Sequence, residues 1–216
     1  MNHLSNWAIQ QTLGNGWSSH KFHQFLKLST QSEFLKSQIP FFYAVQSFPR
    51  ALARLASMIE TNEHRLLVIE NLSEEHGQGD PAKFHTTSFK TFLTALGWNG
   101  NLHTNPWVDE WISLILSRES TPSEYAAYLS GIEYAYAPIS ETITDHLKTL
   151  PLSCEQSHYS NHAELDWEHG NELLEVALMI GSDEKSIKEA FISGQNHFLE
   201  LYNNIMIPTL SLIHIS

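Results

Sequence analysis

Apolar residues recur at three- and four-residue steps along most of this chain, and this spacing is typical of amphipathic α-helices. Between Pro40 and Glu60, for example, Phe41, Val45, Phe48 and Leu52 follow such steps. The alternation of apolar and polar residues that marks a half-buried strand is not convincing anywhere in the sequence. We also find no internal repeat, low-complexity run or linker. The pattern predicts an all-α domain.

Helix boundaries follow from capping residues, prolines and glycines. Asp80-Pro81 and Thr121-Pro122 each combine an N-cap residue with proline at the first helical position. Pro138 is expected to interrupt the helix that opens at Thr121. We expect helical segments over residues 20–35, 40–60, 65–75, 80–96, 106–116, 121–136, 139–150, 158–180 and 183–205. Since the segments 121–136 and 139–150 are separated only by the interruption at Pro138, the expected bundle has about seven to eight helices.

Composition narrows the class of protein. The 216 residues carry a formal net charge of −12, which disfavours binding to the phosphate backbone of nucleic acids. Cys154 is the single cysteine, so no disulfide can form within the chain, as expected for a cytoplasmic protein. We expect no membrane span, because no run of about 18 apolar residues occurs, and no secretory signal. The role of the apolar tail from Pro208 is left open.

The most informative spacing lies in a late helical segment, where His162, Asp166 and His169 stand at positions i, i+4 and i+7. These three side chains fall within about 60° on one helix face and span about 10 Å along its axis. Imidazole and carboxylate together are ligands suited to non-heme iron. A solvated polar face is the alternative. His158 lies one turn earlier and is a candidate alternative ligand or a hydrogen-bond partner of one.

A second group of polar residues surrounds a glycine-rich turn. Glu75 stands near the end of one expected helix and His85 near the start of the next, with Gly77 and Gly79 between them. The glycines allow the backbone to turn, so that a carboxylate and an imidazole can converge on one ion. Acidic residues before such a turn are also common without any metal.

A third element is Glu133, which lies in a stretch of small and aromatic residues ending at Pro138. A glutamate buried there needs a cation, a proton or a hydrogen-bonding partner. Exposure of Glu133 to water is the alternative.

The order of these three elements resembles the heme-oxygenase-like diiron oxidases, a family with a TenA/PqqC-like fold that includes a chlamydial death-domain-associating protein. Members carry an Asn-Leu…Glu-Glu-x-Gly segment before a histidine, a mid-chain glutamate shortly before a proline, and His-x-x-x-Asp-x-x-His on a late helix. This chain matches all three between about Phe48 and Leu174. It has Ala82 where some members have a further glutamate.

The resemblance implies a single heme-oxygenase-like helical bundle over residues 1–216, holding two Fe(II) ions. It assigns Glu75, His85 and His162 to one ion and Glu133, Asp166 and His169 to the other. It also implies an oxidase or oxygenase that uses O₂ on a small organic substrate, with a homodimer as a candidate assembly. The substrate is not specified. Aromatic residues that either line the substrate cavity or simply fill the core are Phe41, Phe42, Tyr43, Tyr134 and Tyr136.

Two alternatives remain on the same fold. A metal-free TenA/PqqC-like enzyme with cysteine chemistry would depend on Cys154, which lies between expected helices. A non-enzymatic binding protein would bind no iron at all.

Overall fold

The computed structural model describes residues 3–181 and 183–206, and α-helices make up most of these residues. The expected all-α class is therefore confirmed. The apolar tail from Pro208 lies outside the described residues. The α-helices are α1 His3–Leu13, α2 Lys21–Leu28, α3 Gln31–Met58, α4 Asn62–Glu75, α5 His85–Ala95, α6 Pro106–Ser117, α7 Pro122–Leu147, α8 His158–Met179 and α9 Glu184–Asn204. Three short 3₁₀ segments accompany them: Trp17–Ser19, Gly77–Gly79 and Pro81–Lys83.

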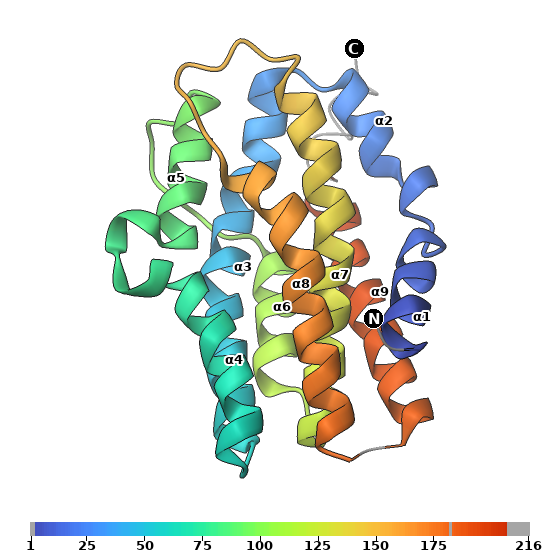
Figure 1. Cartoon of the computed structure of the whole chain (residues 1–216). Helices are drawn as coiled ribbons and strands as arrows, with labels where there is room; N and C mark the ends of the chain where they lie inside the picture. Colours follow the sequence, from blue (N-terminus) through green and yellow to red (C-terminus); the bar gives the residue numbers. More distant parts are fainter. Residues whose placement is uncertain (1–2, 182, 207–216) are drawn as a thin grey trace.

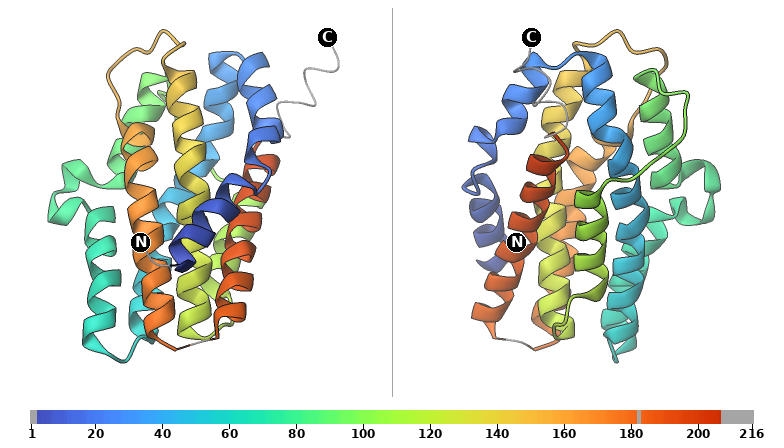
Figure 2. Two further views of the ribbon diagram at one scale, coloured as in Figure 1. Left: turned by 45° about the vertical axis from the view of Figure 1, so that its right-hand side comes forward. Right: turned by 180° about the vertical axis from the view of Figure 1, so that it is seen from behind.

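The long helices lie side by side with α7 at the centre of the bundle (Figure 1). Helix α7 packs against α8 and α9, and α3 contacts α4, α5, α6 and α7. Helices α1 and α2 cover one side of the bundle, and α4 and α5 lie toward the opposite side (Figures 1 and 2). The buried apolar side chains of these helices form one hydrophobic cluster. Among the helices described, none has the length and apolar character needed to cross a membrane.

Helix boundaries near the N-terminus differ from those expected. The helix predicted over residues 20–35 is divided, because α2 ends at Leu28 and α3 begins at Gln31. Thr30 caps α3 with a capping box: its side chain accepts a hydrogen bond from the Glu33 backbone N–H, and the Glu33 carboxylate accepts one from the Thr30 backbone. Helix α1 lies outside every expected segment.

Two prolines expected to begin or interrupt helices, Pro40 and Pro138, lie inside them. Helix α3 runs through Pro40, and α7 runs through Pro138. Most of α7 from Ser123 to Ala137 is buried, so tertiary packing outweighs the cost of the hydrogen bond that Pro138 cannot donate. The result is one continuous helix that carries Glu133 through the centre of the molecule.

The chain between α4 and α5 projects from the side of the bundle at mid-height (Figures 1 and 2). Gly77 and Gly79 adopt positive φ values of 54° and 89°, which are readily accessible to glycine. A Cβ at Gly77 would also overlap Lys83. This tight turn brings the end of α4 and the start of α5 together beside α8.

Candidate metal centre

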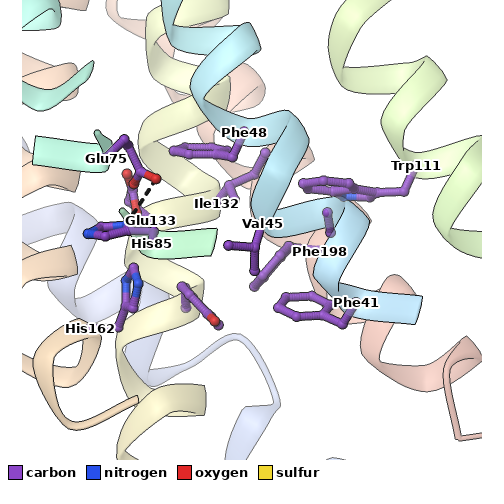
Figure 3. A pocket seen from close by; sticks show the side chains of 12 residues that line it. Phe41, Val45, Phe48, Glu75, His85, Trp111, Ile132, Glu133, His162 and Phe198 are labelled. Atoms are coloured by element: carbon purple, nitrogen blue, oxygen red, sulfur yellow. Dashed lines mark ion pairs between the residues drawn. The ribbon is translucent and has the colours of Figure 1, made fainter. Parts of the chain in front are cut away.

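Four helices contribute the six side chains that the sequence groups as metal ligands. Glu75 is the last residue of α4 and His85 the first of α5, whereas Glu133 lies in the middle of α7. The remaining three lie along the inward face of α8: His162, Asp166 and His169. Figure 3 shows Glu75, His85, Glu133 and His162 pointing toward one another. The structure thus brings together groups that are separated by up to 94 residues, from Glu75 to His169.

The group lies inside the protein. Asp166 is fully buried, and Glu75, Glu133, His162 and His169 are each no more than 6% exposed. The His85 side chain is 16% exposed. The alternatives of a solvated face on α8 and of a water-exposed Glu133 are therefore wrong.

Three of these residues form a compact set of donor atoms. One donor atom each from Glu133, Asp166 and His169 lies within 4.8 Å of the others. These are the three residues that the family resemblance assigns to one ion. Their spacing is compatible with a single cation bound between them.

Glu75 and His85 form an ion pair on the other side of the group, with Glu75 Oε2 and His85 Nδ1 2.9 Å apart. Burial raises the pKa of Glu75, but the His85 charge and hydrogen bond outweigh burial and lower the pKa overall. Burial lowers the pKa of His85, but Glu75 outweighs it and the pKa is raised. The His162 ring lies against His85, with ring centroids 4.6 Å apart.

His162 and Asp166, one helical turn apart, share a hydrogen bond of 2.7 Å between Nδ1 and Oδ1. Burial and the nearby His85 charge lower the pKa of His162 to about 3. The imidazole is therefore neutral at physiological pH, which is the form that binds metals. Because Nδ1 bonds to Asp166, Nε2 is the nitrogen that remains free.

His169 has a partner that the sequence interpretation did not assign. Its Nε2 lies 2.6 Å from Oε2 of Glu74, the half-exposed neighbour of Glu75. Consecutive glutamates at the end of α4 thus contact two different candidate ligands, His85 and His169. The Glu-Glu pair is visible in the sequence, but only the helix register decides which carboxylate reaches which histidine.

Unpaired buried atoms test whether the group fits metal ions. Among the six candidate ligands, five buried side-chain atoms lack a hydrogen-bond partner within the described residues: His85 Nδ1, which contacts Glu75 as an ion pair, and Glu133 Oε1, His162 Nε2, Asp166 Oδ2 and His169 Nδ1. Burial raises the pKa of Glu133 well above its ordinary value, and the Asp166 charge adds to this effect. Burial also raises the pKa of Asp166. A bound cation would accept the unpaired lone pairs and would offset the repulsion between the neighbouring carboxylates. The residues therefore fit a metal centre.

His158 is oriented differently from the six. Its Nδ1 lies 2.8 Å from Ser88 Oγ, and its Nε2 lies 3.3 Å from the Tyr136 hydroxyl. Its ring packs on His162, with centroids 4.5 Å apart. Both ring nitrogens are occupied, so the geometry favours a role in supporting His162 over one as an alternative ligand.

The aromatic residues considered for the cavity fall into two groups. Phe41 and Tyr136 line the cavity that adjoins the candidate ligands. Tyr134 instead faces a groove beside α1, and Phe42 packs against Tyr43 and Phe89 in the core. Cys154 is exposed in the loop between α7 and α8.

Comparisons with known proteins agree with this architecture. Residues 37–203 match the model of a family described as iron-containing redox enzymes. A solved structure of a CADD-like protein of unknown function from Nostoc punctiforme has a TM-score of 0.73 and 14% identity, with 100% of both chains covered. A second structure under the same description has a TM-score of 0.68 and 13% identity, covering 96% of this chain and 94% of the other. No curated protein matches.

At these identities the two structures establish a shared fold, and the family match carries the assignment. The match spans more than half of the chain and includes all six candidate ligands. The chain therefore belongs to the family of iron-containing redox enzymes.

Proposed function

We propose that this protein is a non-heme diiron oxidase or oxygenase that uses O₂ on a small organic substrate. The observation that carries the proposal is the buried group of three carboxylates and three imidazoles with unpaired donor atoms, three of whose members bring a donor atom within 4.8 Å of one another. Glu75, His85 and His162 would hold one iron ion, and Glu133, Asp166 and His169 the other. Carboxylate and imidazole ligands from the interior of a helical bundle suit Fe(II).

Charge supports a two-ion centre. Two Fe²⁺ ions carry four positive charges, and Glu75, Glu133 and Asp166 provide three negative ones. Glu74, which hydrogen-bonds His169, provides a fourth carboxylate at the edge of the centre. The carboxylates of such a buried set must be neutralised by cations or by protons, and two Fe²⁺ ions would supply the cations.

The chemistry that such a pair supplies when bound is the reduction of O₂ to an oxidant of organic molecules. The side chains of this protein hold the ligands in place and exclude water. His158 packs against His162, and Glu74 restrains His169. The apolar residues around the cavity keep the centre dry.

The test compares wild type with Asp166→Ala and, as a matched control, Glu164→Ala, which removes an exposed carboxylate from the same helix. Each protein is loaded anaerobically with Fe(II), its bound iron is measured, and O₂ uptake is followed after mixing. We expect two iron ions per chain and Fe(II)-dependent O₂ uptake for wild type and Glu164→Ala. Asp166→Ala should lose uptake and at least one ion, because the second ion retains only Glu133 and His169.

Circular dichroism must show that Asp166→Ala keeps its helical structure. Equal iron content and equal O₂ uptake in Asp166→Ala and wild type would contradict the proposal. Absence of iron binding in wild type would favour a binding protein or a metal-free enzyme on the same fold.

A further inference from the structure

A cavity begins at the candidate metal ligands and extends into the apolar core. Figure 3 shows Glu75, His85, Glu133 and His162 gathered at one end, with apolar side chains from α3, α6, α7 and α9 at the other. The cavity volume is about 40 Å³, which is room for about three water-sized groups. A substrate that reaches the metal centre from this side must therefore place a small group in it.

The apolar end offers no charged side chain to a ligand. Its walls include Phe41, Phe48, Trp111 and Phe198, each no more than 9% exposed. The Tyr136 hydroxyl lies 3.3 Å from His158 Nε2, and burial raises its pKa well above the ordinary value, so it carries no charge. The indole N–H of Trp111 is buried and unpaired within the described residues, and it is neutral.

Electrostatics restrict what can occupy this space. A charged group at the apolar end would lose its hydration without gaining a counter-ion, which is strongly unfavourable. At the other end, a polar group can reach the metal-binding side chains. The cavity therefore distinguishes the two ends of a substrate: a polar end at the ligands and a hydrocarbon end away from them.

Trp111 closes the apolar end. It lines the internal cavity and also a surface groove between α6 and α9, which includes Trp107 and His197. Its ring packs against Phe198, with ring centroids 5.7 Å apart. The indole thus separates the cavity from the groove and limits how far a ligand can extend.

We propose that the substrate is a small molecule with an uncharged hydrocarbon group in this cavity and one polar group at the metal centre, and that Trp111 limits its length. The part concerning the metal centre rests on the proposed function, whereas the part concerning the cavity does not. Zwitterions and dianions with a second charge at the hydrocarbon end are excluded as substrates.

The first test measures the binding of straight-chain n-alkanols to the metal-free protein by NMR titration. Affinity should rise about fourfold per added methylene up to about three to four carbons, and then stop rising. Straight-chain monocarboxylates of the same lengths should bind the anaerobic Fe(II)-loaded protein, whereas dicarboxylates and ω-amino acids of equal length should bind at least tenfold more weakly. Equal binding of the doubly charged compounds would overturn the proposal.

The second test changes the end wall. Trp111→Ala should move the length limit for n-alkanols to longer chains, because the cavity then joins the surface groove. Trp107→Ala is the matched control: Trp107 lies one turn earlier on α6, is 42% exposed and does not line the cavity, so the limit should stay as in wild type. If Trp111→Ala does not fold, Trp111→Phe should give a smaller shift in the same direction.

The two tests separate the two proposals. If a folded Trp111 variant kept the length limit of the wild type, the inference about the cavity would be wrong. The proposed function, which is tested by iron binding and O₂ uptake, would not be affected by that result. Failure of the protein to bind iron would overturn the proposed function, while alkanol binding to the metal-free protein would still report on the cavity.

Discussion

At the scale of single residues, Glu74 links the surface of the protein to the candidate metal centre. Its carboxylate hydrogen-bonds His169 Nε2, and Nδ1 of the same ring is left unpaired in the interior. A carboxylate bonded to the second nitrogen of a metal-binding histidine fixes the orientation of the ring and increases its basicity. Glu74 is thus a positioning residue for His169.

We expect Glu74→Ala to weaken metal binding by about 10- to 100-fold, because partners of this kind typically contribute that much. Glu74→Gln should recover part of the loss, since its amide oxygen can accept a hydrogen bond from Nε2–H. Glu70→Ala, which removes an exposed carboxylate one turn earlier on α4, is the control. Competition with a calibrated chelator measures all three affinities, and equal losses in Glu74→Ala and Glu70→Ala would show that Glu74 acts only through its charge.

At the scale of helices, α7 and α9 approach closely because glycine lies on both sides of their contact. A Cβ at Gly131 would overlap the Phe191 carbonyl oxygen, and a Cβ at Gly194 would overlap the Tyr128 carbonyl oxygen. These backbone atoms cannot move aside as a flexible side chain can. The contact holds α9 in place, and α9 carries Phe198, a wall of the apolar cavity.

We expect Gly194→Ala to lower the free energy of unfolding by about 1–3 kcal/mol, which corresponds to a decrease in Tm of roughly 2–12 °C for a chain of this size. Gly100→Ala is the control, because a Cβ there meets only Trp98 Nε1, at 4.0 Å. Thermal unfolding followed by circular dichroism measures both variants. Similar Tm values for Gly194→Ala and wild type would mean that α7 and α9 can separate at little cost.

The helices also indicate what sequence reasoning can and cannot achieve. Periodicity and capping predicted the all-α class and most segments, including α4, α6, α8 and α9 to within a few residues. The predicted helix boundaries were wrong at Thr30 and Pro138 for opposite reasons. A local capping box at Thr30 begins a new helix inside a segment predicted as one, whereas packing around α7 keeps the helix continuous through Pro138. The spacing on α8 placed three candidate ligands on one face, but the partnership of Glu74 with His169 depends on tertiary contacts that no local pattern encodes.

At the scale of the whole molecule, the candidate centre lies where helices α4 and α5 meet the central helices α7 and α8. Its ligands come from α4, α5, α7 and α8, and the projecting segment between Glu75 and His85 is held at both ends by candidate ligands. Bound ions would therefore connect the α4–α5 side of the molecule to the central helices. Metal binding should then stabilise the fold as a whole and this segment in particular.

We expect Fe(II) added anaerobically at about 100 times its dissociation constant to stabilise the protein by about 2.7 kcal/mol, or roughly 5–11 °C in Tm. Amide hydrogen exchange in residues 76–84 should slow on metal binding, because opening this segment would require release of Glu75 or His85 from the ion. Helices α1 and α2 contribute no candidate ligand and should gain protection only through global stability.

Asp166→Ala should lose most of the increase in Tm, whereas Glu164→Ala should retain it. A metal-dependent increase of the same size in Asp166→Ala, or protection that appears in α1 and α2 but not in residues 76–84, would place the bound metal elsewhere in the protein.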